Sequence, residues 1–97
     1  MALLEFYGNG CVHCERMKPL VSRLSSEEKL TIESYEVWEN SENEKKLSDV
    51  DKGLCGGVPF FYNTETGAYI CGETDYEELR EWAKAKTEMT ADKADSK

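Results

Sequence analysis

Two cysteines three positions apart are the residues of this chain best suited to chemistry. Cys11 and Cys14 form a C-x-x-C pair between an apolar segment, residues 2–7, and a segment whose apolar residues have helical spacing. A C-x-x-C pair between a strand and a helix is typical of thiol–disulfide exchange. The spacing predicts Cys11 at the helix N-terminus, where unpaired N–H groups and the helix dipole favour an anion. We therefore expect Cys11 to be the nucleophilic thiolate and Cys14 its resolving partner.

The same pair has two other interpretations. It could be an inert structural disulfide, or half of a zinc site with Cys55 and Cys71, although the spacings match no recognisable ligand pattern. His13 could complete such a site, but an imidazole that stabilises the Cys11 thiolate is the simpler role. We expect no metal site and no cofactor other than the redox-active Cys11–Cys14 disulfide itself.

The other two cysteines receive separate predictions. Cys71 stands at the end of a predicted strand, where a small buried hydrophobic residue is the expected role. Cys55 lies four residues before Pro59 in a glycine-rich segment, which should bring it near the active site. It is either an inert buried thiol or a regulatory thiol or additional exchange partner.

Composition limits the classes of partner. The 97 residues suffice for one small domain. Twenty acidic against twelve basic residues give a formal charge of -8 without a basic cluster, which argues against nucleic acid and anionic membranes and favours a partner with a basic rim. The chain has no long apolar run, and it begins at Met1 without a basic signal region. We expect a cytoplasmic monomer that does not bind membranes.

Apolar periodicity predicts the element order β-α-β-α-β-β-α. The expected strands cover residues 2–7, 30–38, 58–62 and 68–71, and the expected helices cover residues 12–25, 41–51 and 74–86. The two βα units should place their strands parallel, and the last two strands should form a hairpin. This is an α/β fold with a four-stranded mixed sheet and helices on both faces. Residues 1–86 form the domain, followed by a polar, frayed tail over 87–97.

This order, with C-x-x-C after the first strand, resembles the thioredoxin fold in its minimal, glutaredoxin-sized form over about residues 2–86. Pro19 stands where thioredoxins carry a helix-kinking proline, and Gly72 matches a glycine beside the substrate groove. Val58 and Pro59 resemble the cis-proline loop that lies against the active-site disulfide. Glu5 falls where thioredoxins carry a buried Asp that exchanges a proton with the second cysteine.

The resemblance implies roles for these residues. Val58, Pro59 and Gly72 would bind substrate together with Val12, and Glu5 and His13 would support the cysteines. The other interpretation of Glu5 is a carboxylate turned to solvent; if Glu5 is buried, desolvation should raise its pKa.

The chain also departs from the motifs that are usual in thioredoxins and in glutaredoxins. Gly10 replaces the tryptophan that usually precedes the first cysteine in thioredoxins, and Val12-His13 replaces their Gly-Pro. Glutaredoxins usually have Pro-Tyr between the cysteines, Thr before the cis-proline and basic residues for the glutathione carboxylates, whereas here no Lys or Arg precedes Cys11. Thr74 and Asp75 sit near where glutaredoxins hold the γ-glutamyl end of glutathione. His13 is similar to the histidine of thiol oxidases and isomerases, which predicts a moderately oxidising pair.

We therefore predict a thiol–disulfide oxidoreductase that exchanges electrons between a disulfide-bearing protein and a protein or small-thiol reductant. An extended substrate segment would lie along Val58 and Pro59. Tyr7, Val12 and Phe60 either extend that surface or belong to the core. The alternatives are a glutathione-dependent glutaredoxin, a non-catalytic metal or iron–sulfur protein, and a docking module with a vestigial site, which the intact cysteines and Pro59 disfavour.

Overall fold

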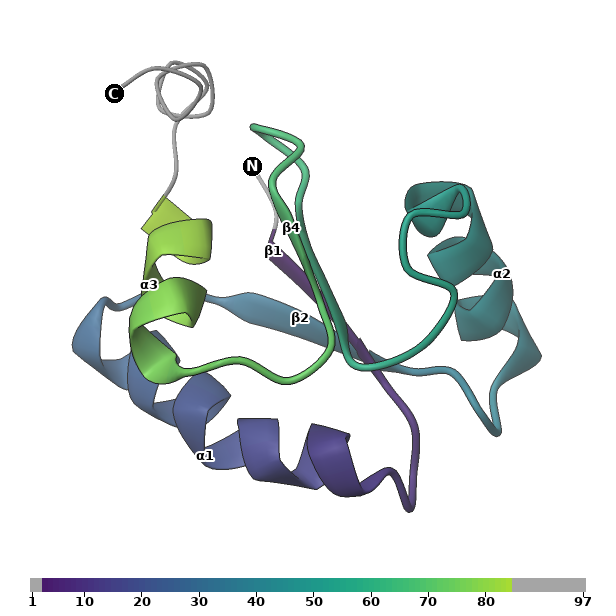
Figure 1. Ribbon diagram of the computed structural model, residues 1–97, viewed down its shortest axis with the longest axis horizontal. Helices are drawn as coiled ribbons and strands as arrows, with labels where there is room; N and C mark the ends of the chain where they lie inside the picture. Colours follow the sequence, from purple (N-terminus) through teal and green to yellow (C-terminus); the bar gives the residue numbers. More distant parts are fainter. Residues whose placement is uncertain (1–2, 85–97) are drawn as a thin grey trace.

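The computed structural model describes residues 3–84, which form a single sheet with helices on both faces (Figure 1). The elements, in chain order, are β1 (Leu3–Tyr7), α1 (Val12–Glu27), β2 (Ile32–Glu36), α2 (Ser41–Asp51), β3 (Phe60–Asn63), β4 (Tyr69–Cys71) and α3 (Tyr76–Lys84). The strand order is β2-β1-β3-β4, with β1 parallel to β2 and the other two pairings antiparallel. The predicted element order and mixed four-stranded sheet are confirmed. The predicted tail, residues 87–97, lies outside the described residues.

Alternation along β1 divides the interior into two apolar layers. Leu3 packs in a cluster with Met17 and Leu24 of α1 and Leu79 of α3, on the face that these two helices cover. Leu4 and Phe6 point to the other face, where residues of α2 pack against them. Figure 1 shows α1 and α3 on one side of the sheet and α2 on the other. Successive strand residues point to opposite faces, so β1, in the middle of the sheet, serves both layers.

The second strand is shorter than its alternating pattern predicts. We expected it over residues 30–38, but it ends at Glu36. The Glu36 carboxylate accepts hydrogen bonds from the N–H groups of Trp38 and Glu39, at 3.0 and 2.9 Å. These two N–H groups are therefore bonded to a side chain, and the chain turns toward α2 instead of extending the strand.

The hairpin and the last helix are joined through one buried asparagine. Asn63, at the end of β3, accepts hydrogen bonds from the N–H groups of Glu65 and Thr66 in the turn. Its side-chain amide donates to the carbonyl oxygen of Trp82 in α3 at 3.2 Å. Asn63 also pairs with Leu3 across the sheet. The start of β1, the hairpin turn and the later part of α3 therefore meet at one end of the strands.

Polar side chains cap the starts of α2 and α3. Asn40 caps α2 by accepting the Asn43 N–H at 3.0 Å, and Asp75 accepts the Glu78 N–H at 2.9 Å at the start of α3. α2 stops at Lys52, whose φ of 49° is left-handed. Between residues 3 and 84, none of the helices is both long enough and apolar enough to cross a bilayer.

Candidate active site

The loop between β1 and α1 places the first cysteine at a helix N-terminus. Gly10, with φ of 89°, turns the chain, and the Cys11 N–H donates to the Gly8 carbonyl oxygen at 3.1 Å. Cys11 is the N-cap residue of α1, and its Sγ accepts the N–H of Cys14 at 3.1 Å. The Cys11 sulfur therefore occupies the position that Ser or Asp usually takes in capping a helix.

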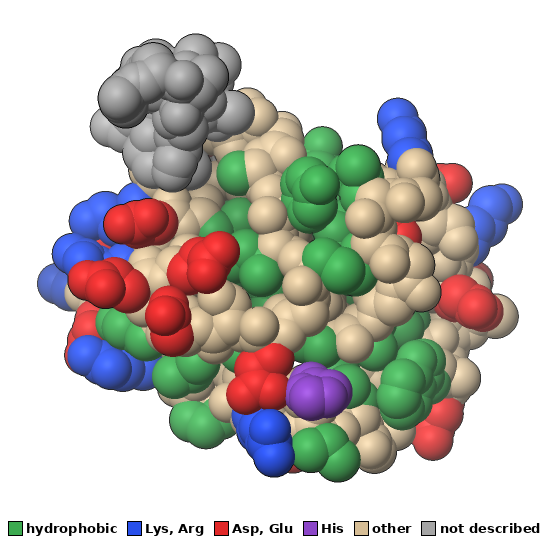
Figure 2. Space-filling view, in the orientation of Figure 1, with side chains coloured by type: hydrophobic (Ala, Val, Ile, Leu, Met, Phe, Trp, Pro, Cys, Tyr) green, Lys and Arg blue, Asp and Glu red, His purple; other side chains and the backbone are tan. Residues whose placement is uncertain are grey.

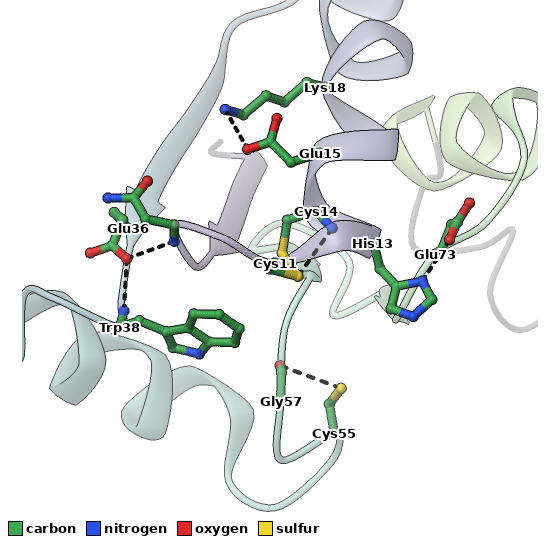
Figure 3. The surroundings of a disulfide bond; sticks show 11 residues. Cys11, His13, Cys14, Glu15, Lys18, Glu36, Trp38, Cys55, Gly57 and Glu73 are labelled. Carbon is green, nitrogen blue, oxygen red and sulfur yellow. Dashed lines mark hydrogen bonds and ion pairs between the residues drawn. A yellow bond between two sulfur atoms is a disulfide. The ribbon is translucent and has the colours of Figure 1, made fainter.

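Cys11 and Cys14 are joined as a disulfide, with their Cα atoms 5.2 Å apart (Figure 3). Cys14 is 1 % exposed and Cys11 is 6 % exposed, so the second cysteine is the more deeply enclosed of the two. In the reduced form, the N–H of Cys14 and the positive end of α1 both favour a negative charge on the Cys11 sulfur. The geometry therefore suits Cys11 as nucleophile and Cys14 as resolving thiol.

The imidazole of His13 is bonded to a carboxylate from another segment. His13 Nδ1 lies 2.7 Å from Oε1 of Glu73, in the segment that follows β4. Figure 3 shows the ring turned toward Glu73 and not toward the two sulfurs, which differs from our expectation of an imidazole beside Cys11. The hydrogen bond from His13 and the charge of Arg16 lower the pKa of Glu73. This hydrogen bond links the start of α1 to the segment before α3.

A shallow groove of about 640 Å³ opens beside His13, which stands between the two cysteines in the sequence. It is lined by His13, Val58, Pro59, Gly72, Glu73, Thr74 and Asp75. The Val58–Pro59 peptide bond is cis, and the Gly72 N–H donates to the Pro59 carbonyl oxygen at 2.8 Å. Three of the four expected substrate-binding residues thus line one groove. The fourth, Val12, is 60 % exposed.

Phe60 does not extend this surface. Its side chain is fully buried in the core with Phe6, so the interpretation that it contacts substrate is wrong. Phe60 lies in β3 between β1 and β4, where residues of both layers are covered.

Glu5 is buried in the middle of β1, at 4 % exposure. It shares the face of Leu3, the one covered by α1 and α3. Desolvation raises the pKa of its carboxyl, against smaller opposing effects of a 2.7 Å hydrogen bond from Ser34 and of the Lys18 charge. Its proton exchange with Cys14 stays a prediction.

Cys55 and Cys71 form a second disulfide, which the sequence analysis did not predict. Cys71 is exposed and Cys55 half-buried, so the interpretations as a buried hydrophobic residue and a free thiol are both wrong. Cys71 lies in the edge strand β4, and Cys55 lies in the loop between α2 and β3. The carboxylate of Asp51 anchors this loop by accepting the N–H groups of Cys55 and Gly56, at 2.6 and 2.8 Å.

Trp38 is a candidate site residue that sequence reasoning missed. It is 58 % exposed, and a Cβ added at Gly8 would lie only 2.2 Å from its indole. The ring therefore covers the backbone of the loop that leads to Cys11. The Glu36 carboxylate joins the same two loops, because it accepts the Asn9 N–H at 3.0 Å as well as the N–H of Trp38. The Asn9 hydrogen bond is the main cause that lowers the pKa of Glu36.

The surface around the site is divided by charge. Figure 2 shows acidic and basic side chains together on one side of the histidine and hydrophobic surface on the other. Exposed apolar side chains on the described part of the chain include Val12, Trp38 and Leu54. Within residues 3–84, no three His, Cys, Asp or Glu side chains are grouped to hold a metal ion.

Comparisons with known proteins agree with this architecture. No protein-family model matches the chain, and no curated protein sequence matches it. Among solved structures, it is similar to the crystal structure of the glutaredoxin (grx-1) from Archaeoglobus fulgidus. The TM-score is 0.61 at 22% sequence identity, and the match covers 88% of this chain and 89% of that chain. The chain therefore has the glutaredoxin-like form of the thioredoxin fold, with its C-x-x-C pair at the N-terminus of the first helix.

Proposed function

We propose that this protein is a thiol–disulfide oxidoreductase that acts on protein disulfides through Cys11 and Cys14. The observation that carries the proposal is the Cys11 sulfur, which caps α1 and accepts the Cys14 N–H. A sulfur in that position is stabilised as a thiolate and has its resolving thiol one helical turn away. The groove supports the proposal, since it offers a place for a substrate beside His13, within the C-x-x-C motif.

Two thiol–disulfide exchanges complete one turnover. The Cys11 thiolate attacks one sulfur of the substrate disulfide, which forms a mixed disulfide and releases the other substrate sulfur as a thiolate. The Cys14 thiolate then attacks the Cys11 sulfur, which closes the Cys11–Cys14 bond and releases the second substrate thiolate. Two electrons pass to the substrate, whose sulfurs take up two protons. Glu5 would accept the proton of Cys14, because burial raises the pKa of its carboxyl and so makes the carboxylate a stronger base.

The groove would hold the substrate as an extended segment. Val58 and Pro59 line the groove, and main-chain hydrogen bonds along Val58 would fix the segment without demanding a particular side chain. Glu73 and Asp75 also line the groove, and their carboxylates favour basic residues in the substrate.

A glutathione-dependent reaction is the second candidate. Its supporting observation is that Thr74 and Asp75 line the groove together with Val58 and Pro59. The residues that line this groove include no Lys or Arg, however, and glutathione carries two carboxylates that call for cations. We therefore favour protein disulfides as the substrate.

The cysteine variants test the proposal. Cys11→Ser should lower the rate of protein-disulfide reduction by about 10³-fold or more, because the nucleophile is lost. Cys14→Ser should instead accumulate a mixed disulfide between Cys11 and the substrate, visible by mass spectrometry. A Cys11→Ser protein that keeps its activity would overturn the proposal. If glutathione alone reduced the oxidised protein faster than a dithiol protein did, the second candidate would replace the first.

The reduction potential decides the direction of electron flow. A value near about -270 mV would indicate a reductant, and a value of about -120 to -180 mV an oxidant or isomerase. Our proposal is a moderately oxidising pair in a cytoplasmic monomer. Trapping the cysteines with an alkylating agent in fractionated cells would show both the compartment and the oxidised fraction.

A further inference from the structure

The second disulfide joins two segments that line the substrate groove. Cys55 belongs to the loop that continues into Val58 and Pro59, and Cys71 directly precedes Gly72. Val58 and Pro59 are one of the segments that line the groove, and residues 72–75 are another. These two segments are joined by the Cys55–Cys71 bond, by the hydrogen bond from the Gly72 N–H to the Pro59 carbonyl oxygen, and by the pairing of Phe60 with Cys71 between β3 and β4.

The loop that carries Cys55 has few other attachments. Gly53 and Gly56 have φ of 83° and 81°, and most of residues 52–57 are exposed. Leu54, the large apolar side chain in the loop, is 48 % exposed. The buried Asp51 carboxylate holds the N–H groups of Cys55 and Gly56, and Cys55 packs against the apolar layer on the α2 side of the sheet. Neither contact joins the loop to β4, so the disulfide is the covalent restraint between them.

The disulfide is open to attack from solvent. Cys71 lies at the end of β4, which is the edge strand of the sheet, and its side chain is exposed. The Cys55 sulfur lies 3.6 Å from the carbonyl oxygen of Gly57, which could accept the S–H of a reduced Cys55 within its own loop (Figure 3). A thiolate in solution can therefore reach Cys71, and the released Cys55 thiol has the Gly57 carbonyl oxygen as a hydrogen-bond acceptor.

We propose that Cys55 and Cys71 form a second redox site, a regulatory disulfide that is reduced by small dithiols and controls the substrate groove. A dithiol's first thiolate attacks the Cys71 sulfur, forms a mixed disulfide and releases the Cys55 thiolate. Its second thiolate attacks the first sulfur of the same reagent, which releases the Cys71 thiolate and leaves a cyclic disulfide. Two electrons pass to the protein, and its two sulfurs take up protons.

Reduction frees residues 52–58 from β4, and substrate then binds a less ordered segment. The other segment is tied to the catalytic helix, because Glu73 bonds His13 only two residues after Cys71. The oxidised site therefore holds the groove in shape, and the reduced site weakens substrate binding while Cys11 and Cys14 keep their chemistry. The effect on substrate rests on the proposed function; the effect on the loop does not.

Hydrogen exchange tests the loop independently of catalysis. In the Cys11→Ser/Cys14→Ser protein, the second pair is reduced with dithiothreitol, and the state of Cys55 and Cys71 is checked by alkylation and mass spectrometry. Circular dichroism confirms that the protein stays folded. We expect faster exchange in residues 52–58 after reduction and no change in α1. Equal exchange in the two states, or reduction only after unfolding, would overturn the proposal.

Single turnovers test the groove. The fully oxidised protein and its Cys55→Ser/Cys71→Ser variant each accept two electrons from an excess of a Lys-rich peptide with two cysteines. We expect the half-saturating peptide concentration to rise by about fivefold or more in the variant, the low end of the usual range for coupled sites. The limiting rate should stay within about twofold, because Cys11 and Cys14 are intact. An unchanged half-saturating concentration would refute control of the groove, and no turnover in either protein would refute the proposed function instead.

Discussion

The two disulfides differ in how the chain brings their sulfurs together. Cys11 and Cys14 are three residues apart, and one turn of α1 places both of them. Cys55 and Cys71 are sixteen residues apart and meet only because a loop after α2 folds against the edge strand β4. The first pair is buried and bonded to the helix backbone, whereas Cys71 is exposed. Local geometry therefore places the sulfurs of one pair, and tertiary structure brings together those of the other.

The largest expected effect is on the free energy of unfolding, which should fall by different amounts when one disulfide or the other is removed. The Cys55→Ala/Cys71→Ala protein should lose about 3 kcal/mol of unfolding free energy, and the Cys11→Ala/Cys14→Ala protein about 2 kcal/mol, because a disulfide that closes a longer loop restrains the unfolded chain more. Urea unfolding of each variant, with its remaining disulfide oxidised, measures the difference. A larger loss for the Cys11/Cys14 variant would contradict this comparison.

An Asp51 variant tests how far the stability of the loop around Cys55 depends on the hydrogen bonds of the Asp51 carboxylate. Asp51→Ala should lower the unfolding free energy by about 2 kcal/mol, since two loop N–H groups lose a buried carboxylate acceptor. Asp49→Ala, on an exposed position of the same helix, is the matched control and should have little effect. Equal losses for the two variants would show that the loop does not need this anchor.

The buried Glu5 carboxyl should make the free energy of unfolding depend on pH. Its folded pKa lies above the usual value of 4.5, so the folded protein binds its proton more tightly than the unfolded chain does. This carboxyl therefore makes the wild type less stable as pH rises through the folded pKa. Glu5→Gln removes that loss and keeps an acceptor for Ser34, so the variant should be more stable at neutral pH and show no such gain at about pH 4. Urea unfolding across this pH range, with Ser34→Ala as control, decides the matter. If the variant gained no unfolding free energy at neutral pH, this would be evidence that burial does not raise the pKa of Glu5.

The smallest effect is expected at the exposed His13–Glu73 pair. Glu73→Gln leaves the imidazole without its carboxylate and should make the Cys11–Cys14 pair more oxidising, by about 30 mV or less. His13→Ala should move the potential in the opposite direction. Equilibration with defined thiol–disulfide buffers measures both variants. Identical potentials in the wild type and the two variants would mean that His13 does not influence the cysteines.

The elements with strong apolar spacing were predictable from sequence, and long-range partners were not. The apolar run of residues 2–7 and the helical spacing of Met17 and Leu24 predicted a strand before the cysteines and a helix after them, as the structure shows. The disulfide between Cys55 and Cys71 depends on how a glycine-rich loop folds onto an edge strand, which no local pattern specifies. The partner of His13 is likewise 60 residues away.

Trp38 illustrates the same limit at the site itself. Its position in the sequence suggested a strand residue, but the Glu36 carboxylate ends that strand and turns the chain. The indole then lies against Gly8, where the absence of a side chain makes room for it. Gly8 and Trp38 are both visible in the sequence, but their contact depends on how the fold places the two loops.

Both ends of the described chain lie away from the cysteines. Leu3 opens β1 opposite Asn63, whose side chain bonds Trp82 near the end of α3, whereas Cys11 follows the other end of β1 (Figure 1). A bead, an electrode or a fluorescent label fixed close to Leu3 or to the end of α3 would therefore start from the side of the sheet away from the groove. The orientation suits this small fold to electron exchange at a surface, with the tether on one side and the reactive sulfur facing the solution.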